Sequence, residues 1–222
     1  MNEEREKVLE VKDLTVSFQT YAGKVQAVRS SSFDLYKRET LAIVGESGSG
    51  KSVTVKTLMG LLGRTAVIEK GSAMYKGMDL TKLTEKQWEK IRGRDIAMIF
   101  QDPLSSLNPI KKIGKQISEI FTILHKMPKA EAKKRTLELM AAVGIPEPEK
   151  RYNQYPFHFS GGMRQRIVIA IALASNPDIL ICDEPTTALD VTIQAQVLAL
   201  IGNLLLRAEA SQPEAFFKPR PS

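Results

Sequence analysis

The sequence of 222 residues predicts an α/β fold in which a parallel β-sheet core is joined to an antiparallel β layer and a helical segment. Three observations predict this fold. A glycine-rich loop, Gly45–Ser52, lies between an apolar run and a helical pattern. Two further apolar runs, Ile96–Phe100 and Ile179–Asp183, are separated by segments with helical spacing. Before residue 37, short segments show the partial alternation of antiparallel strands.

The antiparallel layer and the glycine-rich loop are expected in the first part of the chain. Leu41–Val44 is a continuous apolar run, which predicts a buried parallel strand ending at Gly45. A helix is expected from about Lys51 to Leu62, with Gly63 as its stop. The strands expected in the antiparallel layer are Val8–Val11, Leu14–Phe18, Val25–Val28 and Phe33–Tyr36.

Helical patterns fill most of the remaining sequence. Thr84 is expected to begin a helix, because Gln87 completes a capping box three positions later. The region from about 103 to 159 is a mainly helical insertion between two core strands, since its apolar residues recur at helical spacing. The other expected helices are Lys129–Val143, Met163–Ser175 and Thr192–Leu206.

Composition narrows the class of protein. The net charge of +7 is interpreted as a solvated surface, because the basic residues are scattered without an interleaved aromatic stripe, and no nucleic-acid partner is expected. The single cysteine, Cys182, excludes a disulfide scaffold and suits a reducing cytosol. The charged start of the chain predicts no export segment, and the longest apolar stretch, Ile167–Ala174, is too short to span a bilayer.

The glycine-rich loop matches the full G-x-x-x-x-G-K-[ST] pattern of a phosphate-binding loop. Glycines let backbone N–H groups approach phosphate, and the following helix adds positive potential. Lys51 is expected to reach the β- and γ-phosphates of ATP, and Ser52 to offer its hydroxyl to Mg²⁺. A glycine-rich turn with a chance Lys-Ser is the alternative, but the strand before and the helix after favour nucleotide. The residues expected to contact ATP here are Gly45, Glu46, Ser47, Gly48, Ser49, Gly50, Lys51 and Ser52.

The apolar run that begins at Ile179 ends in two acidic residues, Asp183 and Glu184. Asp183 would stand at the carboxyl end of a buried strand, where it can hold the metal shell. Glu184 would then polarise the attacking water as the catalytic base. A strand that simply ends in polar turn residues is the alternative, which the preceding phosphate loop makes weaker.

A second glycine segment, Phe159–Met163, opens a predicted helix. Ser160 is a fair N-cap, and Gly161 and Gly162 expose backbone N–H groups at a positive helix end, so this is a possible anion site. An ordinary N-cap with a flexible lead-in is the alternative. Gln101, which ends a predicted core strand, can coordinate metal or water, although a strand-terminal glutamine is more often simply solvated.

These segments together resemble the ATP-binding cassette (ABC) ATPases, and most of all the ATPase subunits of bacterial oligopeptide and dipeptide importers. The similar segments occur in the order and with the approximate spacing that the family shows. Phe159 and Met163 differ from the residues usual in the family's signature motif. The matching segments are Gly45–Ser52, Ile99–Pro109, Phe159–Arg166 and Asp183–Gln196.

The resemblance implies a P-loop NTPase with a RecA-like core, an antiparallel β layer and a helical subdomain. It further implies that Gln101 is the mobile catalytic glutamine that also contacts the metal. Ser160, Gly161 and Gly162 would bind the γ-phosphate of ATP held by a second ATPase subunit. Asp190 would communicate between the two subunits of that homo- or heterodimer. Phe18 is similar to the aromatic that stacks on adenine, or is a buried strand-end aromatic.

The resemblance also implies binding partners: transmembrane permease subunits would contact the helical insertion, and an extracellular peptide-binding protein would act through them. It further implies that the chain is a peripheral protein on the cytoplasmic face of the cell membrane. One ABC ATPase domain is expected over residues 1–206, followed by a disordered tail over 207–222. The family's last core strands and its switch histidine have no counterpart in this sequence. Alternatives are therefore a nucleotide-binding remnant with little turnover and a soluble ABC ATPase outside transport.

Overall fold

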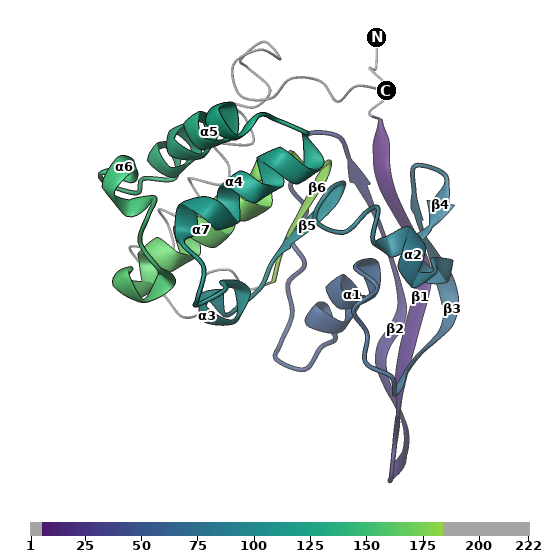
Figure 1. Cartoon of the computed structure of the whole chain (residues 1–222). Helices are drawn as coiled ribbons and strands as arrows, with labels where there is room; N and C mark the ends of the chain where they lie inside the picture. The colour runs from purple at the N-terminus through teal and green to yellow at the C-terminus, as the bar shows by residue number, and fades with distance from the viewer. Residues whose placement is uncertain (1–5, 184–222) are drawn as a thin grey trace. The chain divides into compact units, whose positions relative to one another are not determined.

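The computed structural model of the chain describes residues 6–183 (Figure 1). These residues form two compact units, which divide in sequence between Arg92 and Gly93. The expected helix over 192–206, the tail over 207–222 and the acidic residues Glu184 and Asp190 lie outside the described residues. Within the described part, no helix is both long enough and apolar enough to cross a membrane.

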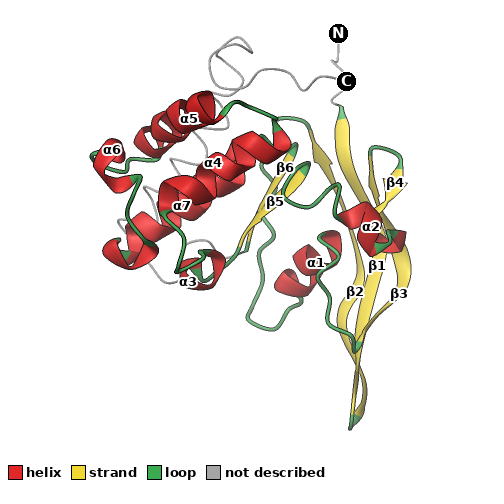
Figure 2. Cartoon of the chain, in the orientation of Figure 1, coloured by secondary structure: helices red, strands yellow, loops and turns green. Residues whose placement is uncertain are grey.

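The first unit is built on a four-stranded antiparallel sheet, which is the expected β layer (Figure 2). Its strands lie in the order β2-β1-β3-β4. Their bounds are β1 Lys7–Thr20, β2 Gly23–Tyr36, β3 Ala66–Tyr75 and β4 Met78–Asp79. The four short strands expected before residue 37 are thus two long ones, and β3 is not among the expected elements.

Bulges explain why the sequence pattern predicts four short strands where the structure has two long ones. Asp13 and Ser30 take left-handed backbone conformations with φ of 49° and 51°, and the register of β1 against β2 shifts between Val11 and Leu14. Side chains hold this distortion, since Ser30 Oγ donates to Asp13 Oδ1 at 2.9 Å and Asp13 N donates to Ser32 Oγ at 2.8 Å. A bulge of this kind breaks the alternation of side chains without ending the strand.

Three short helical elements complete the first unit: α1 Lys51–Leu58, the 3₁₀ turn η1 Leu80–Lys82 and α2 Glu85–Trp88. The predicted capping box of α2 is confirmed, because the side chain of Gln87 accepts the backbone N–H of Thr84 at 2.9 Å. The predicted end of α1 at Leu62 is wrong. Gly60 turns into a left-handed conformation with φ of 60°, and Leu61 N donates back to Lys56 O at 2.8 Å.

The expected buried strand at Leu41–Val44 is also absent. These residues have no regular secondary structure, and Val44 is 88% exposed. A parallel strand is held by ladder hydrogen bonds from neighbouring strands, and no strand within the described residues pairs with this run. The apolar run therefore leads into the phosphate loop as irregular chain.

The second unit contains a parallel strand pair covered by helices. Strands β5 Ile96–Ile99 and β6 Ile179–Cys182 pair in parallel, with Ile99 beside Cys182. The helices between them are α3 Pro103–Ser106, α4 Ile113–Leu124, α5 Lys129–Ala142, α6 Pro148–Arg151, the 3₁₀ turn η2 Pro156–His158 and α7 Gly161–Ala174. Helices α3 to α6 lie where the mainly helical insertion was expected.

One hydrophobic core holds this unit together. It contains apolar side chains of β5, α4, α5 and α7, and Ile99, Ile117, Met140 and Ile169 are fully buried within it. Because α7 contributes buried residues over most of its length, the segment Ser160–Gly162 at its start is anchored to a rigid helix.

Candidate functional site

The phosphate loop joins the irregular apolar run at residues 41–44 to α1. Gly48 and Gly50 take left-handed conformations with φ of 80° and 91°, which a residue with a side chain adopts only with strain. Gly50 is also pressed against β2, since a Cβ placed on it would lie 2.3 Å from the carbonyl oxygen of Ala27. The loop is therefore shaped by the absence of side chains at two positions and seated on the sheet at one.

Lys51 folds back over this loop. Its Nζ donates to the carbonyl oxygens of Gly45 and Glu46, both at 2.7 Å. The ammonium is thus held over the start of the loop by two carbonyl groups. An incoming phosphate would offer this cation charged oxygens, which bind it more strongly than neutral carbonyls do.

Helix α1 presents its amino end at the same place. Gly50 is its N-cap, no side chain caps the helix, and its first turn holds no acidic residue. A helix start without a competing carboxylate keeps its positive end available to an anion. Thr54 stabilises the first turn instead, because its Oγ1 donates to Gly50 O at 3.0 Å.

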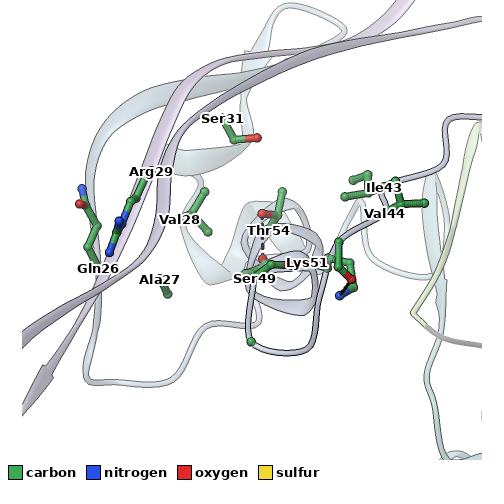
Figure 3. A pocket seen from close by; sticks show the side chains of 13 residues that line it. Gln26, Ala27, Val28, Arg29, Ser31, Ile43, Val44, Ser49, Lys51 and Thr54 are labelled. Atoms are coloured by element: carbon green, nitrogen blue, oxygen red, sulfur yellow. Dashed lines mark hydrogen bonds between the residues drawn. The ribbon is translucent and has the colours of Figure 1, made fainter.

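A pocket of about 490 Å³ lies between the loop and β2 (Figure 3). One wall comes from β2 and the other from the apolar run at residues 41–44, the loop and α1. Its lining residues are Gln26, Ala27, Val28, Arg29, Ser31, Ile43, Val44, Gly45, Gly48, Ser49, Gly50, Lys51 and Thr54. The sequence pattern predicts the loop side of this pocket but not the β2 side, which has no local signal.

Three of the predicted nucleotide contacts at this loop do not line the pocket: Glu46, Ser47 and Ser52. Phe18 does not line it either. It is half-buried in β1, where it pairs with Val25 of β2 and Ala66 of β3. Its role as an adenine platform remains a prediction.

The second unit brings Gln101 and Asp183 to one edge of the β5–β6 pair. Asp183 N donates to Ile99 O at 3.0 Å, so Asp183 lies beside the end of β5, and Gln101 follows that end by two residues. Gln101 is exposed and Asp183 is half-buried. The parallel pairing therefore shows that these two residues follow neighbouring strands at the same edge, whereas their roles at a metal or at water remain predictions.

The second glycine segment has the predicted local geometry. Ser160 is the N-cap of α7, and its Oγ accepts the backbone N–H of Met163 at 3.3 Å. Gly161 and Gly162 are the first two helical residues, and a Cβ on Gly161 would meet nothing within 4 Å. Ser160 and Gly161 are exposed, so the start of α7 is open to solvent.

The chemistry of the predicted metal ligands fits Mg²⁺, which prefers oxygen donors such as the Ser52 hydroxyl, the Gln101 amide oxygen and the Asp183 carboxylate. Over residues 6–183, no three His, Cys, Asp or Glu side chains gather in a group that could hold a metal. This finding does not oppose the predicted set, because Asp183 is its only member of those four types.

Comparison with known proteins identifies the family. The model of the family described as "ABC transporter" matches residues 28–187, which is well over half of the chain. The match runs from the β2 wall of the pocket through the phosphate loop and the second glycine segment. It also includes Gln101, Asp183 and Glu184.

Two curated relatives are similar over nearly the whole chain. The dipeptide transport ATP-binding protein of Lactococcus lactis is 61% identical over 207 residues, which cover 93% of this chain and 59% of that protein. The oligopeptide transport ATP-binding protein of Bacillus subtilis is 57% identical over 206 residues, covering 92% and 58%. The chain thus spans under two thirds of the length of these relatives.

A solved structure shares the fold. The ATP-binding cassette MJ0796, in a dimeric post-hydrolysis state bound to ADP and Pi, superimposes with a TM-score of 0.76 at 28% identity, covering 89% of this chain and 82% of that one. The predicted fold class, an ABC-type P-loop NTPase with an antiparallel β layer, is therefore confirmed. The chain belongs to the ABC transporter family.

Proposed function

We propose that this chain is the ATP-binding and ATP-hydrolysing subunit that energises an importer of oligopeptides or dipeptides. The observation that carries the proposal is the phosphate loop, seated on β2 by Gly50 and bordering a pocket of about 490 Å³. The names of the two relatives, which are 61% and 57% identical, supply the substrate class.

At the loop, each residue has a separate task in this proposal. The left-handed conformations of Gly48 and Gly50 shape a backbone that wraps the phosphates. Lys51 exchanges its two carbonyl contacts for the β- and γ-phosphate oxygens. Ser52, the second residue of α1, offers its hydroxyl to Mg²⁺.

At the edge of the β5–β6 pair, Asp183 and Gln101 supply the remaining protein oxygens for Mg²⁺ and for the attacking water. Glu184, the next residue in the chain, takes the proton of that water as the general base. Mg²⁺, when bound, neutralises the charge of the phosphates. The oxygen-only donor set supports this assignment.

The start of α7 completes a second nucleotide site in a dimer. Ser160, Gly161 and Gly162 present a hydroxyl and backbone N–H groups at a positive helix end that is exposed to solvent. In the proposal they bind the γ-phosphate held by a second ATPase subunit, identical or homologous, and Asp190 communicates between the two. The dimeric state of the structurally similar cassette supports this arrangement.

The remaining partners follow from the transporter role. Permease subunits in the membrane would meet the helical segment that contains Ser105–Pro109, and a peptide-binding protein would act through them. The chain would then be peripheral on the cytoplasmic face of the membrane. The family match and the relatives' names support this placement.

The experiment is affinity capture of the tagged chain from detergent-solubilised membranes of its own cell. The proposal predicts that polytopic membrane proteins are recovered with it, and that the complex hydrolyses Mg-ATP. Tight binding to DNA or RNA with a steep salt dependence, and no polytopic partner, would instead favour an ABC ATPase outside transport.

A further inference from the structure

The carboxyl end of α1 is held by an arginine from more than thirty positions further along the chain. Arg92 Nε donates to Met59 O at 2.7 Å, and Arg92 Nη2 donates to Gly60 O at 2.8 Å. These are the first two residues after the helix ends at Leu58. A cation with two charge-assisted hydrogen bonds at a helix carboxyl end opposes the negative end of the helix dipole.

The arginine is itself fixed on both sides. Its guanidinium lies over the ring of Trp88, 5.0 Å from the ring centre, and it forms an ion pair with Glu85. The side chain of Arg92 is only 22% exposed, and Trp88 is 3% exposed. Exposed ion pairs contribute little to stability, whereas this guanidinium is mostly buried and bonds backbone acceptors.

The residue at the helix end fits this arrangement. A Cβ on Gly60 would lie 2.3 Å from Trp88 Nε1 and the left-handed φ of 60° already disfavours a side chain there. We name the packed group of Gly60, Trp88 and Arg92 the α1 clamp. Helix α2, which begins at the Thr84–Gln87 capping box, supplies Trp88 to this clamp.

We infer that Arg92 is a positioning residue for nucleotide binding, acting through α1 on the phosphate loop. Helix α1 has only eight residues, so its carboxyl end at Leu58 and the loop lysine Lys51 belong to one short rigid element. Fixing one end of such an element fixes the direction in which its other end meets phosphate. This inference rests on the proposed function, because it takes nucleotide as the ligand of the loop.

The test compares Arg92→Gln with Arg64→Gln in the 222-residue chain. Arg64 is exposed in the same unit, so its substitution removes the same charge without touching α1. Two quantities are measured well below the melting temperature: the dissociation constant of Mg-ATP, and hydrogen exchange of the backbone amides of residues 45–52. A purely structural role would lower the melting temperature and leave both quantities as in the parent.

We expect Arg92→Gln to weaken Mg-ATP binding about five- to tenfold, at the lower end of usual couplings between sites, and to speed loop exchange. Arg64→Gln should change neither. Arg92→Lys should lie between parent and Arg92→Gln, since an ammonium cannot reproduce the guanidinium fork. It also carries the test if Arg92→Gln fails to fold.

An unchanged dissociation constant in a folded Arg92 variant would overturn the inference, however far the melting temperature falls. If the parent itself binds no ATP, the proposed function fails, and loop exchange alone decides. Unaltered exchange at residues 45–52 would then refute a positioning role for Arg92.

Discussion

Gly50→Ala is the substitution whose consequence can be worked most fully from the structure, with Gly48→Ala as its matched control. Both glycines have left-handed φ angles, 91° and 80°, so alanine costs roughly 1–2 kcal/mol of conformational strain at either. Only at Gly50 does the new Cβ meet backbone, lying 2.3 Å from Ala27 O, whereas at Gly48 it meets nothing within 4 Å.

The difference between the two variants isolates the contact with β2. Forcing the loop or the strand apart should cost about 1–3 kcal/mol more in Gly50→Ala, as overpacking does elsewhere. The gain from a stiffer unfolded chain is shared by both variants and cancels in the comparison. For a domain of this size the extra loss corresponds to a melting temperature roughly 2–12 °C lower.

Urea unfolding and thermal melting of the two variants, with and without Mg-ATP, measure this difference. Gly50→Ala should also weaken ATP-dependent stabilisation more than Gly48→Ala, because displacement of the loop from β2 deforms the pocket wall. Equal unfolding free energies for the two variants would refute the reasoning, since they would show that the loop is not seated on Ala27.

Three further outcomes test separate parts of the account. Glu184→Gln should retain ATP binding and lower hydrolysis by roughly 10²–10⁴-fold, as loss of a general base does; turnover at the parent rate would remove Glu184 from that role. Ser160→Ala should destabilise the second unit by about 0.5–2 kcal/mol, because α7 loses its N-cap; urea unfolding measures this, and an unchanged unfolding free energy would contradict the capping role. Glu85 has a pKa held below its usual range by the hydrogen bond from Arg92, so its contribution to stability is present above the ordinary pKa of a glutamate and is lost as the pH falls through the lowered value. Glu85→Gln should remove that acid-side loss from a melting profile against pH, and an unchanged profile would contradict the pairing.

Local signals in the sequence predicted the elements that depend on local chemistry. The glycine pattern located the phosphate loop, Gln87 completed the capping box of α2, and Ser160 was recognised as the N-cap of α7. The apolar runs at β5 and β6 predicted a parallel pair, and that pairing brings Asp183 beside the end of β5. The loop, the capping box and the N-cap are each decided by residues within a few positions of one another, whereas each strand of the β5–β6 pair is visible as its own apolar run although the two runs lie far apart in the sequence.

Features that depend on distant residues could not be predicted in this way. Helix α1 ends at Leu58 instead of Leu62, where Arg92 holds the first two carbonyls past the helix. The bulge at Asp13 is fixed by Ser30 and Ser32 and interrupts the alternation of β1, so the sequence pattern predicts two strands where the structure has one. The apolar run at 41–44 reads as a strand, but a strand requires neighbours that pair with it.

The two walls of the candidate pocket differ in the same way in how far the sequence predicts them. The loop residues of the pocket are visible in the sequence because they form one contiguous pattern. The other wall, contributed by Gln26–Arg29 of β2, depends on the contact between Gly50 and Ala27. No spacing rule connects residues on an alternating strand to a loop some twenty positions later, so this wall became visible only in the structure.

The central claim is that Lys51 and the loop around it bind nucleotide phosphate. The most direct measurement is thermal or urea stability of the parent and Lys51→Ala as a function of Mg-ATP concentration. At 100 times the dissociation constant, the parent should gain about 2.7 kcal/mol of unfolding free energy, and Lys51→Ala should gain none at that concentration. A parent that gains nothing, or a variant that gains as much as the parent, would contradict the account.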